Sequence, residues 1–424
     1  MSETVTRREA LKLGAAAGVL AGAARRAAAA TGPKPIRFGF IGVGGRGTGL
    51  LQQALAHEGV EVTAICDINE AHLNRGIDLV RKARGNEPAG HSAGPTDYRR
   101  LLTRDDVDAV LIATPMQLHG RMAADSLRAG KHVLSEVAAA VTVDECLDLV
   151  RAQKESGRTY MLAENVCYYR ANLIVLNMIE QGLFGELTYA ECGYVHDCRS
   201  LLFNGDGSLT WRGELARQES GNWYPTHSLG PVAQWLGINR GDRLVSLVSR
   251  SSPAVGVKDY ATKRFGADHP TTKLPWRGDS NTSLLSTERG RVIELRFDTS
   301  SARPHPTTTY FTLQGATASY HDREAVPSIW VDGKSKEVAW QSINDYAAEY
   351  EHPLWKQWAE QASKTGHGGA DFFVMLEFLE TLRTGRPSPI DAVDAAAWSC
   401  VIPLSAKSVR EGGAPQEIPD FGRA

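Results

Sequence analysis

Three glycines near the N-terminus, Gly42, Gly44 and Gly47, are spaced as G-x-G-x-x-G between an apolar, strand-like run (residues 36–43) and a helical stretch (48–57). In this arrangement the first glycine permits a tight turn, the second lets the backbone approach a pyrophosphate, and the third allows the helix to pack closely on the strand. The N-terminus of the helix then faces the anion. The pattern predicts a dinucleotide-binding site.

An acidic residue at the end of the next strand supports this prediction. Residues 60–66 form a second strand-like run, and Asp67 follows it, twenty residues after Gly47. An aspartate at this position would bind the ribose hydroxyls of NAD and repel the 2′-phosphate of NADP. Arg46 could offset part of that repulsion, so NADP stays open. The alternative is a structural glycine turn with a solvated aspartate.

Residues 108–114 form another apolar strand, and the chain from Ala113 onward reads ATPMQLHGRMAADSLRAGKHVLSEVA. This run resembles the Gfo/Idh/MocA family, whose pattern is a TP-x-x-x-H turn, a helix, AGKHV and a strand ending in Glu-Lys-Pro. The resemblance implies that the nicotinamide side of the cleft is lined by Met116, Gln117, Leu118, His119, Glu136 and Val137. Val137 stands where the oxidoreductases of this family carry the lysine that assists hydride transfer, which argues against simple alcohol dehydrogenation.

A second block, residues 221–231 (GNWYPTHSLGP), places titratable and aromatic groups at the start of a helix. Ordinary members of the family carry an aspartate four positions before this histidine, whereas His227 is preceded there by Trp223. Further matching runs are Glu164-Asn165, QGLFGEL, His196-Asp197, Trp211-Arg212 and residues 368–372. With these runs the chain resembles glycoside hydrolase family 109 over nearly its whole length, and members of that family are NAD-dependent α-N-acetylgalactosaminidases.

The resemblance to family 109 implies a role for each matching residue. Asn165 and Tyr224 would meet the nicotinamide ribose, and His227 and Tyr224 would be catalytic. The sugar would be held by Tyr194, Arg212, Tyr224, Pro225, Thr226, His227 and His305. His305 is the nearest match to a family tyrosine that follows an Arg-Pro pair.

No pair of carboxylates of the kind that conventional glycosidases use stands out in the sequence. The resemblance instead implies that tightly bound NAD oxidises the sugar at C3, a base removes the C2 proton, the C1 substituent leaves, water adds, and the retained NADH reduces C3 again. His227 is the predicted base, because an unperturbed histidine titrates near neutral pH. Tyr224 is placed near C3 or the developing enolate, where it would stabilise charge by hydrogen bonding. An exported NAD(P)-dependent sugar oxidoreductase of the glucose-fructose type and a non-catalytic sensor remain open, as do the sugar, anomer and aglycone.

The length of 424 residues suits two domains. The predicted fold is α/β, with a Rossmann domain at residues 34–166 and a substrate-binding α+β domain with a largely antiparallel, open sheet at 167–424. Helices are expected at 371–384 and 391–410, and whether they pack back on the Rossmann domain is open. The second sheet is also the expected surface for a homo-oligomer.

Residues 1–31 are predicted to be a twin-arginine export signal, with Arg7-Arg8, a weakly apolar middle and an alanine run, so a periplasmic location is expected. Cleavage of the signal is open. The net charge of -2 does not indicate a nucleic-acid partner. No stretch provides the ~20 apolar residues that a membrane span needs. The six cysteines form no C-x-x-C pair, so no metal is predicted.

Overall fold

The computed structural model describes residues 34–423 apart from 219, 305–307, 324–325 and 336–337. The predicted export signal and His305 therefore lie outside the described residues. Within them, no helix combines the length and apolarity that crossing a bilayer requires, and no three His, Cys, Asp or Glu side chains are grouped as a metal site. All six cysteines are buried as free thiols.

The N-terminal domain contains a six-stranded parallel sheet with the order β3-β2-β1-β4-β5-β6, the strand order of a Rossmann fold. The strands are β1 (Ile36–Ile41), β2 (Val60–Cys66), β3 (Ala89–His91), β4 (Ala109–Ile112), β5 (His132–Ser135) and β6 (Tyr160–Leu162). The helices around them are α2 (Gly45–Ala56), α3 (Glu70–Arg84), α4 (Tyr98–Leu102), α5 (His119–Arg128) and α6 (Val143–Ser156). Every residue of β4 and β6 is buried, as expected for parallel strands covered on both faces.

The C-terminal domain contains a nine-stranded sheet with the order β14-β13-β12-β11-β7-β10-β9-β8-β15. Its strands are β7 (Leu187–Val195), β8 (Leu244–Ser251), β9 (Ser280–Thr287), β10 (Val292–Asp298), β11 (Thr309–Gly315), β12 (Ala318–His321), β13 (Ser328–Val331), β14 (Gln341–Ser342) and β15 (Gln416–Glu417). All neighbouring strands run antiparallel except β7 and β10. The predicted fold class, a Rossmann domain with a largely antiparallel second sheet, is confirmed.

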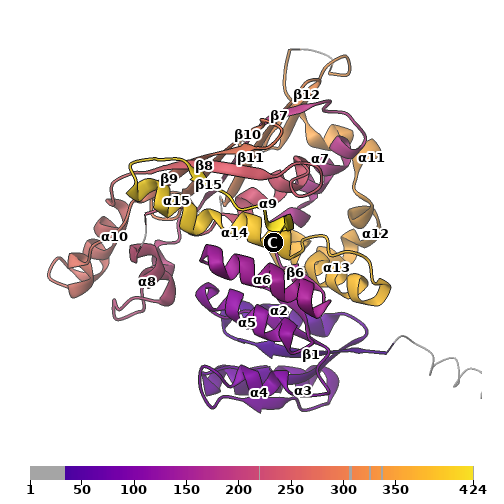
Figure 1. Ribbon diagram of the computed structural model, residues 1–424, viewed down its shortest axis with the longest axis vertical. Helices are drawn as coiled ribbons and strands as arrows, with labels where there is room; N and C mark the ends of the chain where they lie inside the picture. Colours follow the sequence, from indigo (N-terminus) through magenta and orange to yellow (C-terminus); the bar gives the residue numbers. More distant parts are fainter. Residues whose placement is uncertain (1–33, 219, 305–307, 324–325, 336–337, 424) are drawn as a thin grey trace, which may run out of the picture.

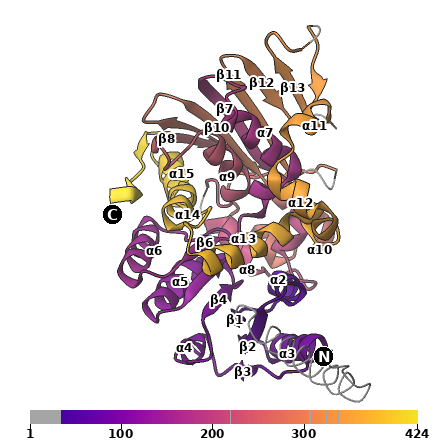
Figure 2. The ribbon, with the colours of Figure 1, turned by 90° about the vertical axis from the view of Figure 1, so that its right-hand side faces the viewer.

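The helices of the C-terminal half are α7 (Arg170–Glu180), α8 (Trp211–Gln218), α9 (Thr226–Trp235), α10 (Gly256–Phe265), α11 (Ala347–Tyr350), α12 (Pro353–Ala362), α13 (Ala370–Thr384), α14 (Ala392–Ser399) and α15 (Val401–Arg410). Of these, α9, α14 and α15 lie between the two sheets (Figures 1 and 2), and α10 and α11 lie toward the ends of the second sheet. Helix α13 contacts α2, and α14 contacts α6 and β6, so the end of the chain packs back on the Rossmann domain. The rings of Phe38 and Phe378, 6.0 Å apart, show this contact within the core.

Two sequence expectations differ from the structure. The single helix expected at residues 391–410 is divided into α14 and α15 at Cys400. Pro403 explains the division, because it has no N–H to bond the carbonyl of Ser399 and its ring would clash there. Strand β3 was not predicted, since three residues, Ala-Gly-His, are too few to show an apolar alternation.

Candidate active site

The glycine turn has the geometry that a bound pyrophosphate needs. Gly42 has a φ of 88°, and its N–H donates to the carbonyl of Cys66 at 2.8 Å. A Cβ on Gly47 would lie 2.1 Å from the carbonyl oxygen of Gly42, so only glycine lets α2 begin this close to β1. At Gly44 a Cβ would meet nothing nearer than the His72 ring at 3.8 Å, which leaves that face open to a ligand. The residues present therefore fit a dinucleotide phosphate at the N-terminus of α2.

Asp67 is fixed beside this turn at the end of β2. Its carboxylate accepts the N–H of Val43 and the N–H of Asn69, each at 2.8 Å. It lines a cleft of about 620 Å³ together with the glycine turn. Two exposed apolar side chains, Ile68 and Leu118, line the same cleft and would give a flat ring apolar surfaces. Ribose and adenine of a dinucleotide fit this arrangement.

Arg46 lies where this cleft meets a second, smaller pocket. Its guanidinium donates to Glu136 at 2.7 Å and to both carboxylate oxygens of Asp371 at 2.8 and 2.9 Å. Burial lowers the pKa of Arg46, but the two carboxylates outweigh it and the pKa is raised. Because its charge is balanced by these two partners, Arg46 is not placed to offset the repulsion between Asp67 and a 2′-phosphate.

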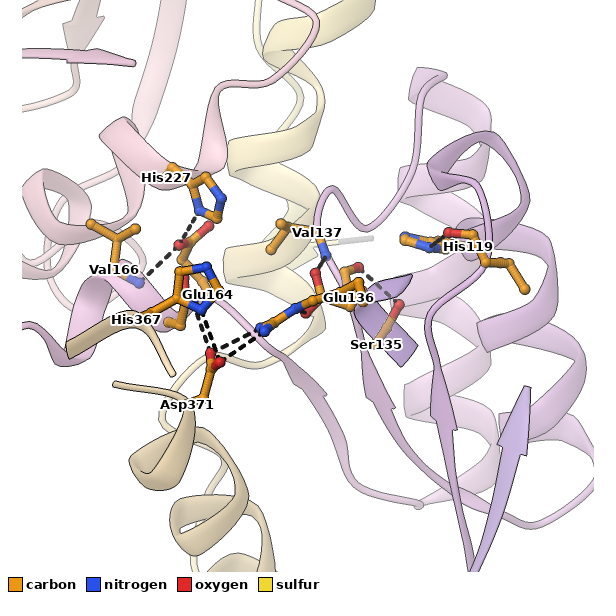
Figure 3. A network of polar contacts seen from close by, with 12 residues as sticks. His119, Ser135, Glu136, Val137, Glu164, Val166, His227, His367 and Asp371 are labelled. Carbon is orange, nitrogen blue, oxygen red and sulfur yellow. Dashed lines mark hydrogen bonds and ion pairs between the residues drawn. The ribbon is translucent and has the colours of Figure 1, made fainter. Parts of the chain in front are cut away.

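The second pocket, of about 210 Å³, adjoins the cleft and draws residues from both domains (Figure 3). Its walls are formed by Arg46, Ala113, Thr114, His119, Glu136, Val137, Asn165, Tyr194, Trp211, Arg212, Tyr224, His227 and His367. The structure thus brings together most residues predicted for the nicotinamide and sugar sites, although they come from segments far apart in the chain.

Other predicted site residues are not among the described walls of this pocket. Met116 is 1% exposed and packs in an apolar cluster with Trp223. Gln117 is exposed and Leu118 lines the dinucleotide cleft. Pro225 and Thr226 are both buried at the start of α9. Neither is among the described pocket walls, so they contribute by positioning their neighbours Tyr224 and His227.

His119 is a wall residue whose ring is fully engaged by backbone. Its Nδ1 lies 2.8 Å from the carbonyl oxygen of Ala138, and its Nε2 lies 2.8 Å from that of Thr114. Burial lowers the pKa of His119. The side chain is 1% exposed and ties the loop after β4 to the loop after β5, which shapes the pocket.

His227, at the start of α9, is paired with a buried carboxylate. Its Nδ1 lies 2.6 Å from Oε1 of Glu164, which also accepts the N–H of Val166 (Figure 3). Burial lowers the pKa of His227, but the charge and hydrogen bond of Glu164 outweigh it, so the pKa is raised. Glu164 was not predicted as a site residue. Its position just after β6, at the carboxyl edge of the parallel sheet, is the signal that could have identified it.

Two tyrosines lie against the His227 ring. The ring of Tyr224 is 5.0 Å and that of Tyr194 is 5.4 Å from it, centroid to centroid. Burial, with Glu136 nearby, raises the pKa of Tyr224. Burial also raises the pKa of Tyr194. Both phenols therefore remain protonated at neutral pH and can donate hydrogen bonds.

Asp371, in α13, bonds to three residues of the pocket walls and was also not predicted as a site residue. Besides Arg46, it accepts from the side-chain amide of Asn165 at 2.9 Å and lies 2.8 Å from Nδ1 of His367. Burial raises the pKa of Asp371, but His367 and Arg46 outweigh it and the pKa is lowered. The side-chain oxygen of Asn165 is buried without a partner, which leaves it available to a ligand hydroxyl.

Two family models match consecutive parts of the chain. Residues 36–164 match a family model described as the NAD-binding Rossmann fold of the oxidoreductase family, and residues 168–424 match one described as the C-terminal domain of glycosyl hydrolase 109. A glycosyl hydrolase family 109 protein of Solibacter usitatus is 40% identical, over 99% of this chain and 98% of its own length. Family 109 protein 2 of Akkermansia muciniphila is 38% identical, over 92% of this chain and 83% of its own length.

Solved structures with lower identity share the fold. Levoglucosan dehydrogenase in complex with NADH has a TM-score of 0.71 at 18% identity, over 91% of this chain and all of its own. Aldose-aldose oxidoreductase from Caulobacter crescentus has a TM-score of 0.65 at 17% identity, with the same coverage. At these identities the likeness extends to the fold alone.

Proposed function

The chain belongs to glycosyl hydrolase family 109, as its motifs predicted, and we propose that it hydrolyses terminal α-N-acetylgalactosaminides by transient oxidation of the sugar with bound NAD. One observation carries the proposal. The dinucleotide cleft opens into a pocket where Glu136 is the sole carboxylate among the described wall residues, and Arg46 already pairs with it. The described walls of this pocket therefore lack the two carboxylates that a conventional glycosidase uses as acid and base. They do contain a histidine that can act as a base, and the cofactor cleft lies beside them.

NAD, when bound, supplies reversible oxidation of the sugar at C3, which makes the C2 proton acidic and leaves no net redox change. The glycine turn, Asp67 and Asn165 would hold it with its nicotinamide toward the pocket. Val137 presents no amine to this site, which separates the chain from the lysine-bearing sugar oxidoreductases.

His227 acts as the base at C2. With Nδ1 donating to Glu164, the neutral ring carries its lone pair on Nε2, which is the nitrogen left for the substrate. When Nε2 takes the proton, the buried carboxylate stabilises the resulting imidazolium, much as the aspartate does in a serine protease triad. Glu164 is thus a positioning residue that also makes His227 more basic.

Tyr224 acts as a hydrogen-bond donor to the oxygen on C3. Its raised pKa keeps the phenol protonated, so it can stabilise negative charge that develops there when the C2 proton leaves. Tyr194 and Arg212, on neighbouring walls, hold the sugar. Arg212 lies over the Trp211 ring at 4.2 Å, which fixes the direction of its guanidinium.

Three further properties belong to the same proposal. The cofactor stays bound through the cycle, and the signal at residues 1–31 exports the folded, loaded protein to the periplasm. Copies of the chain associate through the outer face of the nine-stranded sheet, since the helices lie on the face toward the Rossmann domain (Figure 1). Leu284 and Val292, both partly exposed, lie in the neighbouring strands β9 and β10 of that sheet.

The proposal is tested by incubating the purified protein, without added cofactor, with p-nitrophenyl α-N-acetylgalactosaminide in deuterated water. We expect release of p-nitrophenol, deuterium at C2 of the sugar and no accumulation of NADH. NADH formation on free sugars without release of p-nitrophenol would instead identify a sugar oxidoreductase. Tight NAD binding without turnover of any glycoside would identify a sensor.

A further inference from the structure

The pocket has few apolar surfaces. Apart from Ala113, Val137 and Trp211, every described wall residue carries a charged, imidazole, hydroxyl or amide group. Ala113 and Trp211 also line the dinucleotide cleft, so they lie at the border of the two cavities. Val137 lines the pocket and is not among the described walls of the cleft. It is therefore the apolar wall residue that is left for a substrate in the pocket.

The backbone around Val137 is held on both sides. The N–H of Glu136 donates to the carbonyl oxygen of Ile112 at 2.9 Å. That of Ala139 donates to Oγ of Ser399 at 3.0 Å. The N–H of Val137 itself donates to Oε2 of Glu136 at 3.2 Å (Figure 3). Val137 is 4% exposed, and because its branched side chain has few rotamers, the pocket has a fixed apolar wall at this point.

Val137 lies near the part of the pocket where C2 of a sugar would be held. Under the proposed function the cofactor oxidises C3 of the sugar, so C3 must lie where the pocket meets the cleft. Arg46 lines both cavities and bonds Glu136, the residue before Val137. Because C2 is the carbon next to C3, its substituent reaches the walls beside this border.

The substituent at C2 distinguishes two classes of glycoside. N-Acetylgalactosamine carries an acetamido group there, and this group provides the only methyl of the sugar. Galactose carries a hydroxyl there, which loses its water at an apolar wall without gaining a hydrogen bond. A buried valine beside C2 therefore favours the first class and penalises the second.

We propose that Val137 determines the specificity for the C2 substituent and that its side chain packs against the methyl of an acetamido group. The inference rests on the glycosidase function proposed above and deepens it by naming the residue that selects the substrate class. One missing methylene in an apolar pocket changes kcat/KM by roughly 10- to 200-fold. This single contact is therefore large enough to select N-acetylgalactosaminides over galactosides.

The test compares wild type with Val137→Thr on the p-nitrophenyl α-glycosides of N-acetylgalactosamine and galactose. Threonine has nearly the shape of valine but replaces one methyl with a hydroxyl, which can pair with the C2 hydroxyl of galactose. We expect kcat/KM for the N-acetyl glycoside to fall roughly 10-fold or more, and that for the galactoside to stay level or rise. Val137→Ala is the second variant, because it removes both methyls whichever way threonine turns its hydroxyl, and we expect the same loss of preference.

Val150→Thr is the matched control. Val150 lies in α6, is 6% exposed and is not among the described walls of either cavity, so it reports the cost of a hydroxyl at a comparably buried position. The NAD content of each protein and the dissociation constants of free N-acetylgalactosamine and free galactose are the further measurements. We expect the NAD content to be unchanged and the preference in binding to fall together with the preference in kcat/KM.

Three results would overturn the assignment. Equal losses on the two sugars would mean that Val137 only supports the pocket, and an unchanged preference in both variants would mean that it does not contact the C2 substituent. The third is a wild type that does not prefer the N-acetyl sugar. If wild type releases neither aglycone, the glycosidase proposal has failed, and the ratio of the two dissociation constants still decides whether Val137 contacts the acetamido group.

Discussion

The dinucleotide cleft and the pocket proposed to hold the sugar share a border but are built in opposite ways. The cleft is formed almost wholly by residues 41–122, and its polar anchor, Asp67, bonds a backbone N–H 24 residues away. The pocket brings together side chains from both domains: Glu164 and His227 are 63 residues apart, and Arg46 and Asp371 are 325 apart. The cleft is therefore a local, backbone-built site, whereas the pocket exists only in the complete fold.

This difference separates binding from chemistry. In the cleft, a bound cofactor would meet backbone N–H groups, apolar walls and the carboxylate of Asp67. In the pocket, charged side chains are paired with partners from other elements: Glu164 raises the pKa of His227, and Glu136 and Asp371 raise that of Arg46. Substitutions in the two regions are then expected to affect different quantities, cofactor affinity in one and turnover in the other.

The largest such effect is expected for His227→Ala. Loss of a positioned base lowers the rate by roughly 10²- to 10⁴-fold, while the cleft is untouched and NAD content stays at the wild-type level. Turnover of the p-nitrophenyl glycoside and NAD per protein chain are the two measurements, with His321→Ala as the control. A variant that keeps full activity, or one that loses NAD, would contradict the separation of the two regions.

Tyr224→Phe is expected to lower turnover by about 10²-fold, since one hydrogen-bond donor to a developing charge is removed. Because its pKa is raised, Tyr224 stays protonated below pH 10, and the variant should keep the wild-type pH profile in that range. Full pH profiles of kcat/KM would show this. Tyr310→Phe, in β11 and outside the pocket, is the matched control. A changed profile would mean that Tyr224 itself transfers a proton.

The same contrast explains what could be predicted from the sequence. Gly42, Gly44 and Gly47 are constrained by atoms close in the chain, so their spacing alone indicated the cleft. Strand β2 was predicted with the bounds that the structure has, because its apolar pattern is local.

The pocket could be predicted only where a family motif marked it. His227 and Tyr224 lie in such a motif, and the structure places both in the pocket walls. Glu164 and Asp371 lie in matching runs too, but no local spacing indicates that one carboxylate meets a histidine 63 residues on or that the other meets Arg46. Those pairings follow from the packing of α9 and α13 on the Rossmann domain, which periodicity does not encode.

Asp67→Asn tests the cleft by itself. The amide offers one acceptor oxygen in place of two and carries no charge, so it binds the ribose hydroxyls more weakly and no longer repels a 2′-phosphate. NAD affinity should therefore fall about 10-fold, and discrimination against NADP should narrow. Titration of cofactor-free protein with each dinucleotide measures both. Turnover at saturating NAD should match wild type. A fall in that saturated rate would mean that the cleft also directs the chemistry.

Glu164→Gln should have the smallest effect at neutral pH and the clearest effect on pH dependence. The base must be neutral, and Glu164 raises the pKa of His227, so the acid limb of kcat/KM in wild type lies above the ordinary histidine value of ~6.5. In the glutamine variant the charge of Glu164 is gone, while burial still lowers the pKa of His227. The acid limb of kcat/KM therefore moves to lower pH. The amide oxygen takes the place of Oε1, where it accepts the N–H of Val166 and that of His227, so Nε2 keeps its lone pair. The neutral ring becomes a weaker base, and the plateau falls by less than about 10-fold.

Stability should follow the same linkage. The pKa of His227 is higher in the folded protein than in the unfolded chain, so protonation of His227 stabilises the fold. This contribution is complete below the unfolded-state pKa and is lost as the pH rises through the folded-state pKa. Glu164→Gln should therefore lower the Tm relative to wild type more at pH 5 than at pH 9. Equal changes in Tm at both pH values, together with an unmoved acid limb, would show that the buried carboxylate does not control the charge of His227.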